Sequence, residues 1–222
     1  MIYINYITNY KIIENIFNNF IKHTRNSNLY YSGNLKNHVD NEINKSLNEK
    51  IIIATQKIKK NLDKNFYTEN DLNIWNICVT KNNFMFNYPF TLSNIIFIPK
   101  NIINSKDIVN TLIHEKIHIF QRYNINYWNN YILDNTPFKL CKMVLYDNEI
   151  LNPDTLYEFN FIYSHNNQSY RGIILYDKNN IKEYWTLNNK ITFDNNLPTY
   201  THPYEVYAYK WADMINNDEY CK

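Results

Sequence analysis

The chain has 222 residues, a net charge of +2 at pH 7 and 45% hydrophobic residues. This length and composition indicate a globular chain with a core of good size, and they exclude a fibrous or wholly disordered protein. Because acidic and basic residues are interspersed and no concentrated basic patch is present, nucleic acid is not expected as a partner.

The first third of the chain is predicted to be helical. Apolar residues recur at helical spacing over residues 10–22 and again over residues 39–60. The polar segment between these two helices contains Gly33, one of only two glycines in the chain. We therefore expect an N-terminal helical region that spans residues 1–70 and carries no catalytic group.

The pattern changes to strands after Asp71. Residues 77–80 and 84–87 are each predicted as a strand, and residues 90–99 as a longer strand that ends at Pro99. A helix follows, with Ser105 as its N-cap and Asp107 in its first turn, and the apolar spacing extends it to about residue 122.

The last third combines short strands with one helix. Strands are predicted at residues 157–164, 170–176, 183–187 and 190–193, joined by Asn-rich turns into hairpins. The final helix begins near Pro203, because proline suits the first helical position. The predicted fold class is α+β, with a small mixed or antiparallel sheet. One domain covers residues 71–222 and contains a hairpin-rich insert at about 135–196.

One motif in the chain carries recognisable chemistry, His114-Glu115-Lys116-Ile117-His118, which is H-E-x-x-H. Residues four apart lie on one face of a helix, so the two imidazoles can bind the same Zn²⁺ ion. Glu115 lies about 100° around the helix and can act as a general base on a water activated by the metal. The alternative is a surface turn with two solvated histidines. The apolar helical pattern around the motif and the strand before it favour the metal site.

A catalytic zinc site needs a third protein ligand and one open position. The downstream candidates are Asp134, Asp147, Glu149, Asp154, Glu158, His165, Glu183, His202 and Glu205. We favour Glu205, because it lies in the first turn of the last predicted helix, which can pack across from the motif. The alternative is a carboxylate that stabilises the helix dipole or forms a capping box with His202.

Tyr209 is one turn after Glu205 and shares its face of the predicted helix. A tyrosine hydroxyl near the metal can stabilise the oxyanion of a tetrahedral intermediate, and His202 or, less directly, Arg171 could do the same. With 21 tyrosines in the chain, a tyrosine near any site is also expected without a function.

The motif and its surroundings resemble the zincin metallopeptidases, specifically the gluzincin type. The segments that carry the resemblance are residues 94–99, 111–122 and 202–205. Their sequences are similar to those of uncharacterised metallopeptidase-like proteins of large DNA viruses. The resemblance implies that His114 and His118 are zinc ligands, that Glu115 is the base and that Glu205 is the third ligand.

The same resemblance implies that residues 94–98 form an edge strand, with which an extended peptide substrate would pair. Two features depart from the gluzincin pattern. Tyr209 stands where many gluzincins have an aspartate that orients a zinc histidine, and 87 residues (205 − 118) separate His118 from Glu205.

These observations together predict a zinc-dependent metallopeptidase with a peptide or protein substrate. The alternatives are a non-catalytic zinc-fold protein of a virion or of a host interaction, and a zinc hydrolase of non-peptide substrates. Three widely spaced cysteines without a C-x-x-C pair predict reduced thiols. With no signal-peptide pattern and no apolar run of about 20 residues, we expect a cytoplasmic protein, in a host cytoplasm or a virion, with no membrane partner.

Overall fold

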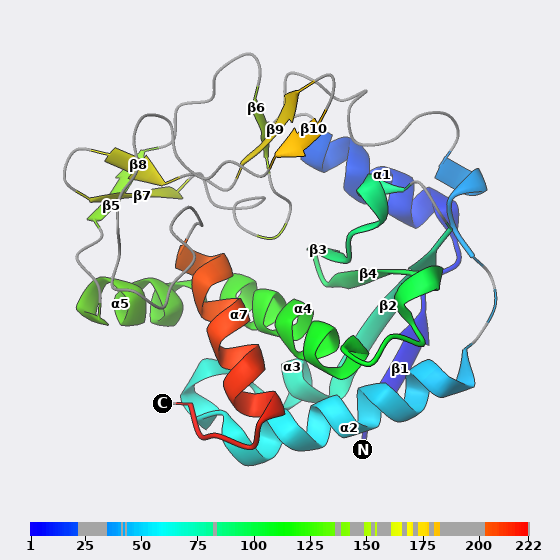
Figure 1. Ribbon diagram of the computed structural model, residues 1–222, viewed down its shortest axis with the longest axis horizontal. Coiled ribbons are helices and arrows are strands. Elements are labelled where there is room, and N and C mark those ends of the chain that lie inside the picture. Colours follow the sequence, from blue (N-terminus) through cyan, green and yellow to red (C-terminus); the bar gives the residue numbers. More distant parts are fainter. Residues whose placement is uncertain are drawn as a thin grey trace.

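The computed structural model describes residues 1–21, 35–40, 42, 44–81, 84–135, 139–142, 149–151, 154, 161–165, 168–170, 173–177, 180–182 and 203–221. Its described part is a mixed α+β structure, which confirms the predicted class (Figure 1). The α-helices are α1 (Tyr10–Ile21), α2 (Lys45–Asn61), α3 (Glu69–Asn73), α4 (Ile108–Tyr123), α5 (Ile125–Asn135) and α7 (Pro203–Asn216). Short 3₁₀ helices are η2 (Leu35–Asn37), η3 (Lys64–Phe66), η4 (Met85–Asn87) and η5 (Lys100–Ile102).

A mixed sheet of four strands has the order β1-β2-β4-β3. Its strands are β1 (Tyr3–Tyr6), β2 (Ile74–Thr80), β3 (Phe90–Leu92) and β4 (Ile95–Pro99). β1 pairs with β2, and β2 with β4, in parallel, whereas β3 and β4 form an antiparallel pair. The N-terminal strand β1 therefore belongs to the same sheet as the strands that precede α4.

Helix α4 lies at the centre of the molecule and is buried from Leu112 to Arg122. It packs against α7 and α2, with β3 at another side (Figure 1). The core around α4 is built from residues of α2, β2, β4, α4, α5 and α7. A fully buried Leu or Ile side chain contributes about 1.5–3 kcal/mol, so this core holds α4 and α7 firmly against each other.

The two faces of the sheet pack against different layers of the molecule, because successive side chains of a strand point to opposite faces. Ile96 and Ile98 of β4 join the core around α4, while Phe97 between them points the other way. On that second face, Phe97 stacks on Phe90 of β3 and makes an edge contact with Phe17 of α1. Helix α1 thus covers the sheet face opposite the core helices.

The predicted helices are largely confirmed. α1 matches residues 10–22, α4 ends one residue beyond the expected position, and α7 begins at Pro203 as its first residue. α2 begins at Lys45 and not near residue 39, because the side chain of Asn44 accepts a hydrogen bond from the Leu47 N–H and caps the helix there. The N-cap of α4 is Asp107, so the prediction of Ser105 is wrong.

Two predicted strands are wrong in the structure. Residues 85–87 form the 3₁₀ helix η4, in which Met85 and Asn87 have positive φ and cannot continue an extended run. The single long strand predicted at residues 90–99 is a hairpin of β3 and β4, because Ser93 has a φ of 56° and starts a two-residue turn.

Helix α5 has no counterpart in the prediction, because only Trp128, Asn129 and Ile132 of its 11 residues are buried.

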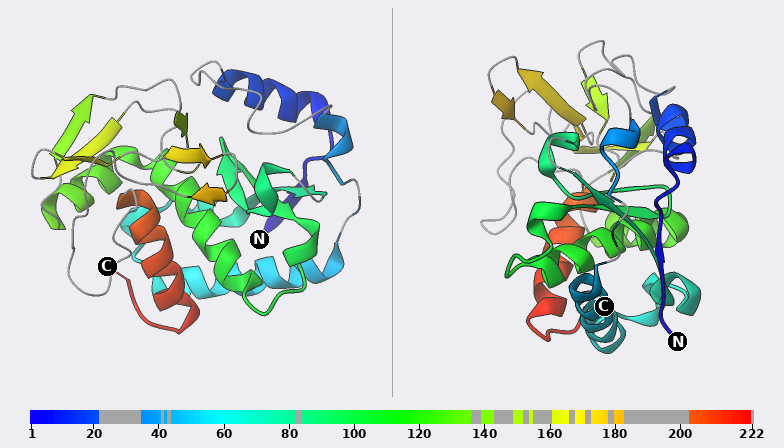
Figure 2. Two further views of the ribbon diagram at one scale, coloured as in Figure 1. Left: turned by 45° about the horizontal axis from the view of Figure 1, so that its top comes forward. Right: turned by 90° about the vertical axis from the view of Figure 1, so that its right-hand side faces the viewer.

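Two antiparallel sheets of three strands occupy the predicted insert, with orders β5-β7-β8 and β10-β9-β6. Their strands are β5 (Lys139–Lys142), β6 (Glu149–Leu151), β7 (Phe161–His165), β8 (Gln168–Tyr170), β9 (Ile173–Asp177) and β10 (Asn180–Lys182). Both sheets lie on the side of the molecule away from α2 (Figure 1 and the right-hand view of Figure 2). The strands predicted at 183–187 and 190–193 lie outside the described residues. No helix in the described ranges has the length and apolar character to cross a bilayer.

Candidate metal centre

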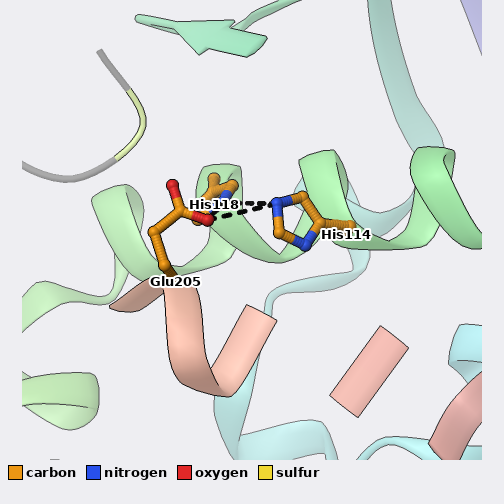
Figure 3. A group of neighbouring side chains, drawn as sticks. All are labelled: His114, His118 and Glu205. Atoms are coloured by element: carbon orange, nitrogen blue, oxygen red, sulfur yellow. Dashed lines mark hydrogen bonds and ion pairs between the residues drawn. The ribbon is translucent and has the colours of Figure 1, made fainter. Parts of the chain in front are cut away.

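Three buried side chains converge between α4 and α7. His114 and His118 lie one turn apart on α4, and Glu205 faces them from the first turn of α7 (Figure 3). Their exposed fractions are 8%, 0% and 3%. The alternative of two solvated histidines on a surface turn is therefore excluded, and the structure brings the favoured candidate Glu205 to both of them.

The separations between the three facing atoms suit one small ion. His114 Nε2 lies 3.1 Å from His118 Nε2, and Glu205 Oε2 lies 3.4 Å from the first and 3.5 Å from the second. Ligand atoms of a tetrahedral zinc ion at about 2.0–2.1 Å are separated by about 3.3–3.4 Å. The donor set of two imidazoles and one carboxylate is typical of transition metals and disfavours Mg²⁺ or Ca²⁺. This group could therefore bind a metal ion.

The electrostatics of the group favour a positive charge between the three side chains. Burial opposes the protonated ring, but the Glu205 carboxylate raises the pKa of His118 to about 9. Burial also opposes the charged form of Glu205, yet His118 and His114 together hold the pKa of Glu205 well below its usual value. Burial lowers the pKa of His114. In the metal-free protein a proton supplies this positive charge, and a bound cation would take its place.

The two histidines are oriented by different means. His118 Nδ1 lies 2.8 Å from Oε1 of Gln121, the next residue on the same face of α4. His114 Nδ1 is buried and has no hydrogen-bond partner among the described residues. Instead, the ring of Tyr209 lies against the ring of His114, with 4.2 Å between the centroids. This contact confirms the predicted place of Tyr209 beside the site, while its catalytic role stays a prediction. Tyr209 is 49% exposed.

Glu115 is buried beside the sheet and is held by Thr91 of β3. The Thr91 hydroxyl lies 2.8 Å from Glu115 Oε2 and donates a hydrogen bond to it. Burial, and then the negative charge of Asp154, raise the pKa of Glu115 well above its usual value. No sequence pattern singles out Thr91 as a functional residue. It lies 24 residues before Glu115, and the only signal was that the strand containing it precedes the motif helix.

The expectation that residues 94–98 form an edge strand is wrong. β4 lies between β2 and β3, so the short strand β3 takes the edge position. The free edge of β3 is already bonded to side chains. The Thr91 N–H donates to the Asp154 carboxylate, and Arg122 donates to the carbonyl oxygens of Ser93 and Thr91, at 2.6 and 3.4 Å. A peptide could pair with this edge only by replacing those contacts.

Of the other candidate ligands whose side chains the structure describes, Asp134 and Asp154 do not belong to the group. Asp154 contacts β3, and Asp134 is exposed near the end of α5. Glu149 and His165 lie in β6 and β7 of the two smaller sheets. The remaining candidates, and the alternative oxyanion group Arg171, lie outside the described residues; they are Asp147, Glu158, Glu183 and His202.

Lys116, inside the motif, points away from the group of His114, His118 and Glu205 and into the core. It is fully buried, and its Nζ donates to the Ile74 carbonyl oxygen at 2.6 Å and lies 4.7 Å from the centre of the Trp75 ring. Burial lowers the pKa of Lys116 to about 7. The unfolded chain therefore binds more protons than the folded chain between about pH 7 and pH 10.5, and stability rises with pH over this window.

We expect a Lys116→Met variant to remove this pH dependence. From pH 7 to pH 9, the free energy of unfolding of the metal-free wild type should rise by about 2 kcal/mol relative to the variant. Urea unfolding at several pH values measures the difference, with Lys59→Met on the exposed side of α2 as the matched control. A difference that does not change with pH would show that the Lys116 amine is not buried as described.

Comparison of the chain with protein-family models, with curated proteins and with solved structures found no match. The class of the protein is therefore described from its fold and its site alone. It is a mixed α+β protein with a buried group of two histidines and one glutamate that could hold a metal ion.

Proposed function

We propose that the protein is a zinc-dependent metallopeptidase of the gluzincin type, with a zincin-like core formed by the four-stranded sheet, α4 and α7. The observation that carries the proposal is the position of Glu115. This buried carboxylate is adjacent to His114, does not belong to the three-residue group and is held by the Thr91 hydroxyl. A purely structural zinc site has no use for such a base and closes its fourth position with a protein ligand.

The donor set and the atom separations fit Zn²⁺, with His114, His118 and Glu205 as the residues that hold it. When bound, zinc lowers the pKa of a water molecule and polarises the carbonyl of the scissile bond. The described residues supply three donors, and a catalytic zinc site would keep one further position open for water or substrate.

The roles of the protein groups follow from their positions. Glu115 takes a proton from the attacking water and delivers it to the leaving amine. A raised pKa suits this task, because a base whose pKa lies nearer the working pH transfers protons more effectively. The ring of Tyr209 lies against that of His114, and the role assigned to its hydroxyl is to donate a hydrogen bond to the developing oxyanion.

A second candidate is a non-catalytic zinc-fold protein of a virion or of a host interaction. Two observations favour it. Glu115 is only 1% exposed, and the edge of β3 that a peptide substrate would use is bonded to Arg122 and Asp154. In this candidate the ion holds α4 and α7 together, and the protein acts through its surface.

Metal removal and restoration test the proposal. We expect the purified protein to contain about one zinc ion per chain by elemental analysis. Cleavage of a broad peptide library should be lost on chelation and regained when zinc is added to the stripped protein. His114→Ala, with His38→Ala as the control at a histidine whose ring contacts Phe84, should show whether the ion occupies this group.

The two candidates separate on the same preparation. Stoichiometric zinc with no cleavage of any peptide would support the non-catalytic protein and remove the peptidase. A protein that takes up no metal, or takes it up equally after His114→Ala, would contradict both.

A further inference from the structure

Gln121 connects α4 to α7 beside the candidate metal group. It lies on α4, is 1% exposed and makes two hydrogen bonds inside the protein. Its Nε2 donates to the backbone carbonyl oxygen of Tyr204 at 2.9 Å, and its Oε1 faces His118 Nδ1 at 2.8 Å. Tyr204 belongs to the first turn of α7 and immediately precedes Glu205.

These two bonds decide which nitrogen of His118 keeps its proton when the ring binds a metal in its neutral form. A backbone carbonyl can only accept a hydrogen bond, so the NH₂ group of Gln121 must face Tyr204. The amide oxygen then faces His118, and an amide oxygen can only accept. His118 Nδ1 is therefore the donor, which leaves Nε2, the atom that faces His114 and Glu205, free to bind a metal.

We propose that Gln121 is the positioning residue of the metal centre: through Tyr204 it holds the turn that carries Glu205, and through its amide oxygen it fixes the tautomer and ring direction of His118. The proposal rests on the metal-binding part of the proposed function and not on peptide hydrolysis. One side chain thus aligns a ligand of α4 with the ligand of α7. Outer partners of metal-bound histidines act in this way by orienting the ring and setting its tautomer.

The contrast with His114 explains why the effect concentrates on His118. No described residue bonds His114 Nδ1, and the contact with the Tyr209 ring limits its direction without selecting a tautomer. Loss of Gln121 would leave both histidines without a hydrogen bond at Nδ1. It would also leave a buried Tyr204 carbonyl without the donor that now ties it to α4.

Metal affinity of three variants tests the proposal. Gln121→Met keeps the volume and removes both bonds, and we expect the zinc affinity, measured by competition with a chromophoric chelator, to fall about 10- to 100-fold. Gln121→Glu keeps an acceptor for His118 Nδ1 but loses the donor to Tyr204, and we expect it to recover part of that loss. Asn110→Ala is the matched control, because it removes a 2.7 Å hydrogen bond between the same two helices, from Asn110 to Asp213. Its zinc affinity should stay within about threefold of wild type.

A second measurement needs no variant. In the zinc-loaded wild-type protein, ¹⁵N–¹H spectra of the histidine rings should show a slowly exchanging proton on His118 Nδ1 and the metal on Nε2. Zinc on Nδ1 of His118 would overturn the proposal, and so would a Gln121→Met affinity equal to that of wild type. If the wild type binds no zinc at all, it is the proposed function that fails, so the two failures are told apart.

Discussion

A Glu115→Gln variant is expected to keep its zinc and to lose about 10²- to 10⁴-fold of kcat for peptide hydrolysis, the range that general acid–base catalysis contributes. Glutamine has the shape of glutamate and its amide oxygen can still accept the hydrogen bond from Thr91, so the fold and the three donors are left in place. What is lost is the ability to take a proton from water. Steady-state kinetics on a cleaved library peptide, with zinc content measured on the same sample, gives the result.

The matched control for this variant is Glu49→Gln on the exposed side of α2. It makes the same chemical change away from the site and should keep full activity. If Glu115→Gln and Glu49→Gln cleave the peptide equally fast with equal zinc content, Glu115 is not the base and the peptidase proposal fails.

The second large effect is expected for Glu205→Gln, which should weaken zinc binding by more than the about 10- to 100-fold that outer partners of a metal site contribute. The change removes the only anionic donor of the group and leaves two neutral imidazoles. It also removes the charge that raises the pKa of His118. The increase in melting temperature on addition of zinc should therefore shrink or vanish, because a ligand stabilises the native state in proportion to the logarithm of its affinity.

Glu219→Gln is the control for this second variant, because it makes the same chemical change at an exposed carboxylate that follows α7. It should bind zinc as wild type does. Equal zinc affinity of Glu205→Gln and wild type would mean that another residue is the third ligand. Asp154 would then be the first to examine, since its carboxylate interacts electrostatically with His118 and Glu205.

The parts of the structure that local periodicity determines were predictable from the sequence. The helices that carry the site, α4 and α7, were predicted to within a few residues, because each has a strong apolar stripe and α7 begins with a proline. The placement of Glu205 opposite the two histidines was expected from the resemblance to the gluzincin arrangement. His114, His118 and Glu205 are a group in the structure as expected, and their role as zinc ligands stays a prediction.

Features that depend on turn geometry or on long-range packing were not predicted, because hydrophobic periodicity does not determine them. The turn at Ser93 that divides β3 from β4 depends on a positive φ at this residue, and a serine in the sequence does not predict a positive φ. The support of Glu115 by Thr91 depends on a strand that lies 24 residues away in sequence and is brought close by packing. Helical spacing places Gln121 on the histidine face of α4, but its partner is a backbone carbonyl of α7, and a backbone contact between distant segments has no sequence pattern.

The connection between α4 and α7 has a consequence for how an ion enters and leaves this protein. His118 and Glu205 are 87 residues apart in sequence, so an ion bound by both would close a long loop of chain. Contacts of such sequence separation form late, after the entropy of closing the loop has been overcome. Such an ion would therefore not nucleate folding, in contrast to modules whose ligands lie within one short segment. It would bind after the two helices have docked, and its residence time would then report on how often they part, which is a property of the kinetic stability of the fold.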